Sequence, residues 1–205
     1  MSISSRRIAE LVRLGEAGDP LGINLVPCPD IGQIDTSGEA SITLRLGRWF
    51  LSMKQTNQTH LDVVAAEDAA MAEASISKKH FVPFGESFVI HPGRFVLAST
   101  LEWITLPSNL AAYVTGKSTW GRRGIVIETA AGVHPSFSGC LTLEIANLGE
   151  VPVSLRPGMA ICQVFLHEVH GPSVSSRTAL SGRRRPVLGR AKADSILTAL
   201  SAKKR

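Results

Sequence analysis

Short apolar runs, some of them alternating with polar residues, are separated by polar turns along most of the chain, and this pattern predicts a mainly β protein. From residue 81 onward, short apolar runs are separated by turn signals such as His91-Pro92-Gly93, so that a strand recurs about every ten residues. Because this spacing is typical of sandwiches, barrels and jelly rolls, we expect an architecture of that kind. The expected strands cover residues 40–53, 88–90, 95–101, 112–115, 125–129, 140–147, 151–155 and 161–168.

A helical period replaces the alternation mainly near the N-terminus. The apolar residues of 5–14 fall on one face of a helix, which the Ser4-Ser5 pair can cap and Gly15 can end. Residues 20–38 are rich in Pro, Gly and Asp, so we expect irregular chain there. The sequence of two further segments, 62–77 and 191–200, is compatible with either a short helix or irregular chain.

Composition places the chain among globular proteins with a real core. It has 205 residues, of which 44% are hydrophobic and 19% charged. No apolar run approaches the roughly 20 residues of a membrane helix, and Arg6 and Arg7 interrupt any signal peptide. The three cysteines form no metal-binding or paired spacing, so reduced thiols in a cytoplasmic protein that contacts no membrane are expected.

The net charge of +5 is concentrated in the C-terminal tail. Nine basic residues and one acid lie between Arg177 and Arg205, whereas the rest of the chain is mildly acidic. A basic tail attracts nucleic acids or triphosphates, but no aromatic residue interleaves with these cations to stack on bases. We therefore favour a solvated tail over a nucleic-acid contact.

A carboxylate in the middle of an apolar strand is the first candidate for chemistry. In the strand over 140–147, Leu141, Leu143 and Ile145 point to the core, and Glu144 points to the opposite side. An unpaired buried carboxylate is costly, so a cleft wall or a subunit boundary would explain Glu144, and a general base is the chemistry that it offers. The alternative is a solvent-facing glutamate on an exposed sheet face.

The segment 116–124 offers hydroxyls, cations and flexible backbone within nine residues. Such a set can close a shell around a phosphate, since arginine grips oxygens in a fork and backbone N–H groups complete the site. A Walker A loop is excluded because Ala111 stands where that motif needs glycine. A polar surface turn remains the alternative. The candidate anion contacts are Lys117, Ser118, Thr119 and Arg122.

The loop over 131–139 carries glycine near both ends and can bring its backbone close to a sugar or base. Phe137 suits either a sugar face or the core. His134 is the single titratable group in the loop, where a structural histidine is commoner than a catalytic one. The remaining histidines show no spacing typical of zinc ligands, so no zinc site is expected.

Taken together, these segments resemble the dCTP deaminase family, in the superfamily shared with trimeric dUTPases. The resemblance covers 3–172, is strongest over 88–165, and is specific because several motifs occur together. The motifs are Gly116-Lys117-Ser118-Thr119 with Arg122-Arg123-Gly124, Ala131-Gly132-Val133 with Phe137-Ser138-Gly139, Leu143-Glu144-Ile145-Ala146-Asn147, and Arg156-Pro157-Gly158-Met159 with Gln163.

The resemblance implies a distorted β-barrel or jelly roll of the dUTPase type with short flanking helices over 1–172. The basic tail, 173–205, would then serve as a lid and carry the terminal helix. It also implies a homotrimer with active sites at subunit boundaries, and leaves pairing of trimers into hexamers open.

The activity that the resemblance implies is zinc-independent conversion of dCTP and water to dUTP and ammonia, with Mg²⁺ accompanying the triphosphate. Glu144 falls on the glutamate that activates water against C4 of cytosine, and Ser118 and Arg122 fall on residues that position water, base and phosphate. Lys117 stands where the family usually has arginine. The remaining implied substrate contacts are Thr119, Ala131, Val133, His134, Phe137 and Gln163.

Two departures from the family pattern keep other functions open. His134 stands where the family usually has aspartate, and the tail has no tyrosine or glutamine over 173–190, although it offers Arg177 and Arg183-Arg184-Arg185. A nucleotide-binding trimer with altered catalysis, serving as a sensor or regulator, is one alternative. A nucleotide pyrophosphatase, or a deaminase with changed sugar or base specificity, is the other.

Overall fold

The computed structural model describes residues 3–57, 60, 74–128, 132–170, 181–189, 196 and 199. Most of the two segments left open between a short helix and irregular chain, 62–77 and 191–200, lies outside these residues. No helix in the described ranges is both long enough and apolar enough to cross a membrane. The elements are α1 (Ser5–Glu16), β1 (Asn24–Val26), α2 (Ile31–Ser37), β2 (Ile42–Met53), β3 (Ser77–Phe81), β4 (Phe88–Ile90), β5 (Phe95–Thr105), β6 (Leu110–Gly116), α4 (Ser118–Gly121), β7 (Ile125–Glu128), β8 (Gly132–Val133), β9 (Ser138–Asn147), β10 (Val153–Leu155) and β11 (Ala160–Glu168).

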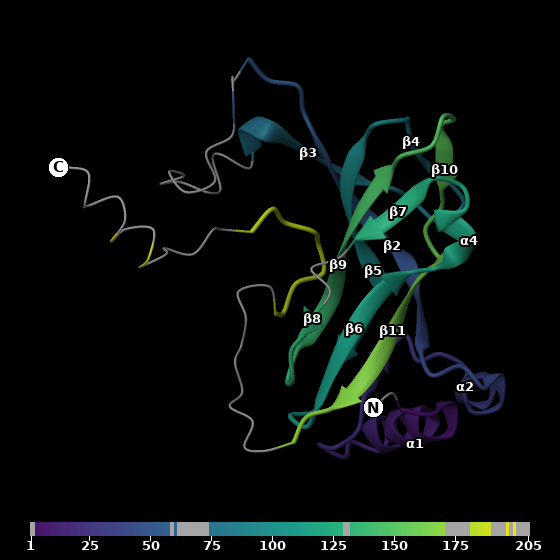
Figure 1. Ribbon diagram of the computed structural model, residues 1–205. Coiled ribbons are helices and arrows are strands. Elements are labelled where there is room, and N and C mark those ends of the chain that lie inside the picture. Colours follow the sequence, from purple (N-terminus) through teal and green to yellow (C-terminus); the bar gives the residue numbers. More distant parts are fainter. Residues whose placement is uncertain are drawn as a thin grey trace.

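One curled antiparallel sheet dominates the molecule, as the alternating pattern predicted (Figure 1). Its strand order is β7-β9-β5-β2-β11-β6-β8, with β1 added on β5 and β3 on β2. A small second sheet pairs β10 with β4 at the end opposite α1 and α2 (Figure 1). The prediction of a mainly β fold is therefore confirmed.

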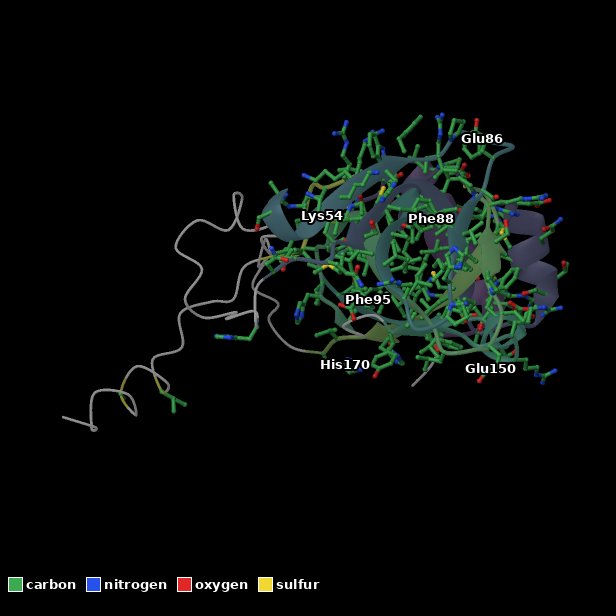
Figure 2. The ribbon with its side chains drawn as sticks, turned by 90° about the horizontal axis from the view of Figure 1, so that it is seen from above. Lys54, Glu86, Phe88, Phe95, Glu150 and His170 are labelled. Atoms are coloured by element: carbon green, nitrogen blue, oxygen red, sulfur yellow. The ribbon has the colours of Figure 1, made fainter. Side chains whose placement is uncertain are left out.

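The core fills the inside of the curve. Seen from above, side chains pack the space that the sheet encloses (Figure 2). Phe50 is 1% exposed and stacks on Phe88, with 4.7 Å between ring centroids. Ile8 and Ile23, from the N-terminal part, are fully buried in the same cluster. The N-terminal helix is therefore part of the core that supports the sheet.

Helix α1 forms as its sequence predicts, except at its end. Ser4 caps it by accepting a hydrogen bond from the Arg7 backbone N–H at 3.4 Å, and its apolar face is buried. The helix does not end at Gly15 but runs one residue further. A Cβ at Gly15 would lie 2.1 Å from the Ile23 carbonyl oxygen, so this glycine permits close packing of the chain before β1.

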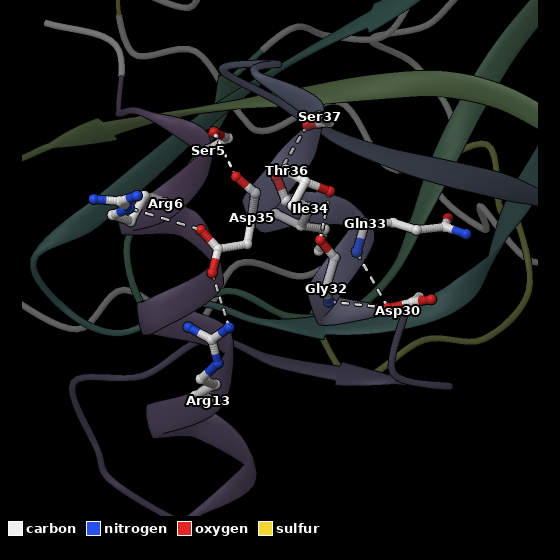
Figure 3. A network of polar contacts seen from close by, with 10 residues as sticks. All are labelled: Ser5, Arg6, Arg13, Asp30, Gly32, Gln33, Ile34, Asp35, Thr36 and Ser37. Atoms are coloured by element: carbon white, nitrogen blue, oxygen red, sulfur yellow. Dashed lines mark hydrogen bonds and ion pairs between the residues drawn. The ribbon is translucent and has the colours of Figure 1, made fainter.

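The expectation of irregular chain over 20–38 was wrong in part, because β1 and α2 lie within it. The Asp30 carboxylate accepts hydrogen bonds from the backbone N–H groups of Gly32 and Gln33 (Figure 3). Gly38 ends α2 at φ 70°. The Pro, Gly and Asp signals therefore mark the caps of a short helix as well as turns. Arg13 then joins α1 to α2 through an ion pair with Asp35 at 3.0 Å (Figure 3).

Edge strand β3 was also missed, and α4 and β8 are elements too short for the pattern to show. Among the described strands β3 pairs only with β2, and it carries Lys78, Lys79 and His80, a polar run that does not show the alternation expected of a strand. Charged residues are common on sheet edges because they oppose pairing with other chains. The expected strands were otherwise found, with shifted ends.

Candidate active site

Glu144 lies at the middle of β9, where both neighbouring strands hold its backbone. It pairs with Leu97 of β5 on one side and with Glu128 of β7 on the other. Burial alternates through the strand, with Leu143 and Ile145 fully buried and Glu144 half-buried, so the predicted facing is confirmed. Within the described chain, its carboxylate makes no hydrogen bond or ion pair. The structure thus presents a rigidly mounted carboxylate without a cationic partner.

Asn147 fixes the end of the strand that carries Glu144. It is 0% exposed, and its amide nitrogen donates to the carbonyl oxygens of Ile90 and Val151, both at 2.9 Å. Its side-chain oxygen accepts the Gly149 backbone N–H at 3.0 Å. Asn147 is therefore a structural member of the Leu-Glu-Ile-Ala-Asn motif, joining β9 to β4 and to the turn before β10.

Lys117 and Gln163 come together in one polar cluster. The Lys117 ammonium donates to the Thr43 hydroxyl at 3.0 Å, although the two residues are 74 positions apart. Gln163 lies between them in the sheet, because it pairs with Thr43 of β2 and with Thr115 of β6. Two predicted substrate contacts are thus adjacent, with Thr43 as a neighbour that the sequence did not indicate.

The hydroxyls and the guanidinium of 116–124 occupy one exposed turn. Ser118, Thr119 and Arg122 are all exposed, and the Arg122 backbone N–H donates to the Ser118 carbonyl at 3.0 Å. Trp120 anchors the turn, because its indole N–H donates to the Ala160 carbonyl at 2.7 Å. The turn packs against β7, but among the described residues no hydrogen bond or ion pair joins it to Glu144.

The loop before β9 places its predicted contacts in different surroundings. Val133 and Phe137 are 7% and 9% exposed and belong to the core, which favours the core interpretation of Phe137. His134 is exposed, and its carbonyl accepts the Phe137 backbone N–H at 3.2 Å in a tight turn. Ala131 lies outside the described residues. Among the described predicted contacts of this loop, His134 is therefore the one whose side chain is exposed.

A second acid inside an apolar strand, Glu102, was not singled out from the sequence. It is 5% exposed at an irregularity of β5, and its carboxylate accepts the Arg45 backbone N–H at 2.8 Å. Burial raises the pKa of the Glu102 carboxyl, against the opposing effect of that hydrogen bond. The signal that indicated Glu144, a carboxylate inside an apolar strand, is present at Glu102 too. It was missed because the strand was expected to end at Leu101, one residue earlier.

Part of the basic tail lies on the sheet. The Gly182 backbone N–H donates to the Ser138 carbonyl at 2.7 Å, and the Cys140 N–H donates to the Arg183 carbonyl at 2.9 Å. The chain over 182–187 therefore runs along the start of β9 and carries Arg183, Arg184 and Arg185 with it. Arg177, the other cation expected to bind phosphate, lies outside the described residues.

Comparisons with known proteins agree with these motifs. A family model described as dCTP deaminase-like matches residues 4–169. A "dCTP deaminase, dUMP-forming" of Corynebacterium glutamicum is 34% identical over 175 residues, covering 84% of each chain. Proteins of the same name from Methanobrevibacter smithii and Nocardia farcinica are 37% and 35% identical, covering 83% and 93% of this chain and 82% and 91% of their own.

The fold is similar to that of a solved enzyme. The 2′-deoxycytidine 5′-triphosphate deaminase from Agrobacterium tumefaciens superposes with a TM-score of 0.57 at 20% identity, over 79% of this chain. That chain is longer, and the match spans 48% of it. At this identity the superposition supports the fold, and the sequence matches carry the assignment. The chain belongs to the dCTP deaminase-like family.

Proposed function

We propose that this protein deaminates dCTP, with Glu144 as the general base. The observation that carries the proposal is the unpartnered, half-buried carboxylate at the middle of β9. Glu144 takes a proton from water, whose oxygen bonds to C4 of cytosine, and passes protons to N3 and to the leaving amine. The C4–N bond breaks, so dCTP and water give dUTP and ammonia.

The exposed turn of α4 would supply the contacts that Glu144 lacks within its own chain. The side chains of Ser118 and Arg122 are open to solvent and have no partner among the described residues, so they are free to orient water, base and phosphate. Because no hydrogen bond or ion pair among the described residues joins the turn to Glu144 and completes a site in one chain, we propose a homotrimer. In it, the turn of one subunit faces β9 of another.

Phosphate binding is assigned to the polar cluster and the neighbouring turn. Lys117, Thr119 and Gln163 offer a cation, a hydroxyl and an amide at one region of the sheet. The described residues include no group of three or more His, Cys, Asp or Glu side chains that could hold a metal ion. The Mg²⁺ of the proposal is therefore one carried on the triphosphate, where it would offset phosphate charge.

A second hydrolysis, which would convert dUTP and water to dUMP and pyrophosphate, is favoured by the relatives. All three relatives described above carry the name dUMP-forming. In this step water attacks the α-phosphorus and pyrophosphate leaves. His134 is the residue to examine, because it stands exposed where the resemblance leads us to expect aspartate. We propose that the chain performs this step after deamination.

The test is to incubate the purified protein with dCTP and Mg²⁺ and to quantify ammonia, pyrophosphate, dUTP and dUMP. Glu144→Gln should abolish ammonia release while dCTP binding, measured by calorimetry, persists. Glu168→Gln, an exposed acid on β11, is the matched control and should keep full activity. Ammonia release by the Glu144→Gln variant, or dCTP binding to the wild type without product, would refute deamination by this carboxylate. Accumulation of dUTP without pyrophosphate would refute the second step.

A further inference from the structure

A cavity of about 510 Å³ lies between the basic tail and the sheet. Its walls come from Lys79 of β3, Trp103 of β5 and the chain over 182–187, which we call the arginine segment. Four cationic residues line it, including Arg183, Arg184 and Arg185, and none of the described lining residues is acidic. A cavity whose lining carries one sign of charge concentrates polyanions.

The arginine segment is held to the body of the protein by its backbone. Two hydrogen bonds join it to the start of β9, at Ser138 and Cys140. Pro186, at its far end, is buried, whereas the arginines before it are exposed. The segment therefore has a defined path, and the side chains of its arginines remain accessible to solvent.

Two tryptophans fix where the arginine side chains lie. The Arg185 guanidinium sits 4.0 Å from the centroid of the Trp49 ring, and that of Arg184 sits 5.4 Å from the Trp103 ring. A guanidinium stacked in this way uses its face, and its N–H edges stay available to bind phosphate oxygens. Neither arginine donates a hydrogen bond to another described residue.

The tryptophan rings are themselves oriented by the sheet. The Trp103 indole N–H donates to the Ser138 hydroxyl at 2.9 Å, and the Trp49 ring packs on Phe81 with 4.8 Å between centroids. Both contacts are independent of the tail. The rings are thus a fixed platform on which the arginine segment docks.

This platform lies on the same face of the sheet as Glu144. Trp103 pairs directly with Cys140, and Cys140 shares its side of β9 with Glu144 four residues further along. Four residues of extended strand span ~13 Å. A nucleotide whose base lies at Glu144 can therefore extend its phosphates toward the arginine segment.

We propose that Trp49 and Trp103 are positioning residues that hold Arg185 and Arg184 ready to bind the triphosphate of the substrate. The choice of the triphosphate as ligand rests on the proposed function, whereas the positioning of the two arginines by the two tryptophans does not. Because contacts within the chain itself hold both guanidinium groups on the rings, the arginine segment is organised in advance, and less ordering has to accompany binding. Removing a ring should release one arginine and weaken binding of the phosphates beyond the first.

The experiment compares Trp49→Leu, Trp103→Leu and the double variant with the conservative Trp49→Phe and Trp103→Phe. Loss of one cation–π contact corresponds to about two- to fivefold in affinity. We expect KM for dCTP to rise by about that factor for each leucine variant, with kcat and the affinity for dCMP unchanged. The phenylalanine variants should recover most of the loss. Phe84→Leu removes a matched arginine contact, that of Arg48 at 4.8 Å, and should change nothing.

Calorimetry with inorganic tripolyphosphate separates this proposal from the proposed function. If the wild type binds tripolyphosphate and the leucine variants bind it about two- to fivefold less tightly per ring, the positioning role is supported even where dCTP is not turned over. If the wild type turns over dCTP but the double leucine variant keeps its KM and its tripolyphosphate affinity, the positioning role is refuted and deamination stands. Equal losses for dCMP and dCTP, or in kcat, would indicate a general structural defect and would also refute it.

Discussion

Replacing Asn147 with alanine tests whether a buried amide holds in place the strand that carries Glu144. The residue is 0% exposed, and its side chain makes three hydrogen bonds, two as donor and one as acceptor. Alanine would leave the carbonyl groups of Ile90 and Val151 and the N–H of Gly149 without this partner. All three lie where β9, β4 and the turn before β10 meet.

The expected cost is large because the amide loses one buried and two part-buried hydrogen bonds at once. A net contribution of about 1 kcal/mol per hydrogen bond, with a further penalty for unsatisfied buried groups, gives a loss of about 3–4 kcal/mol. For a chain of this size, 1 kcal/mol corresponds to about 2–4 °C, so Tm should fall by roughly 10 °C. Asn147→Asp keeps the shape and the acceptor but removes both donors, and should be at least as damaging at pH 7.

Thermal unfolding followed by circular dichroism is the assay, at one protein concentration because association shifts apparent stability. Asn109→Ala, at an exposed position in the turn between β5 and β6, is the control and should stay within about 0.5 kcal/mol of the wild type. A loss below about 1 kcal/mol for Asn147→Ala would refute the reasoning. Near-wild-type stability of Asn147→Asp would show that the two donated bonds contribute little.

Three further predictions follow from the buried groups and glycines. Because burial raises the pKa of Glu102, the folded state binds the carboxyl proton more tightly than the unfolded state does. The free energy of unfolding should therefore fall as pH rises from the unfolded pKa near 4.5 through the raised pKa of the folded state. Glu102→Gln should remove this dependence, and an equal change in stability at pH 5 and pH 8 in urea unfolding would contradict the prediction. Gly15→Ala should destabilise by several kcal/mol, although helix propensity alone predicts a gain of about 1 kcal/mol, because the new Cβ would lie 2.1 Å from the Ile23 oxygen. Gly32→Ala, whose Cβ would meet only the Asp30 carboxylate at 3.2 Å, is the control, and equal thermal unfolding of the two variants would count against the steric argument. Burial raises the pKa of the Cys162 thiol to about 12, so iodoacetamide at pH 8 should modify this residue only after unfolding; rapid labelling in the native protein, detected by peptide mass, would contradict its burial.

The sequence predicted those parts of the fold where one period dominates. β9 was found with the correct facing because its apolar positions alternate without a glycine or proline from Cys140 to Asn147. Helix α1 was found because a cap precedes three apolar residues at helical spacing. The short α2 was missed because Asp and Gly signal a helix cap and a turn equally well.

Contacts across the sheet could not be predicted from local patterns. The bond from Lys117 to Thr43 depends on β2, β11 and β6 being neighbours, which no spacing of residues reveals. The tail arginines were expected to bind phosphate, but their stacking on Trp49 and Trp103 requires the sheet to bring the two rings under the tail. Residue types were therefore predictable at the site, and partners were not.

The two acids of the apolar strands show why a charge in a strand is an insufficient sign of catalysis. Glu102 is 5% exposed and already accepts the Arg45 N–H, so it has neither access to a substrate nor a free orientation. Glu144 is half-buried, has no partner in the described chain, and shares its face with Trp103 and the arginine segment. A general base must exchange protons with a bound molecule, which requires an open path as well as a carboxylate. Solvent and substrate can reach Glu144 but not Glu102, and this difference separates the catalytic candidate from the structural acid. A sequence pattern does not predict it.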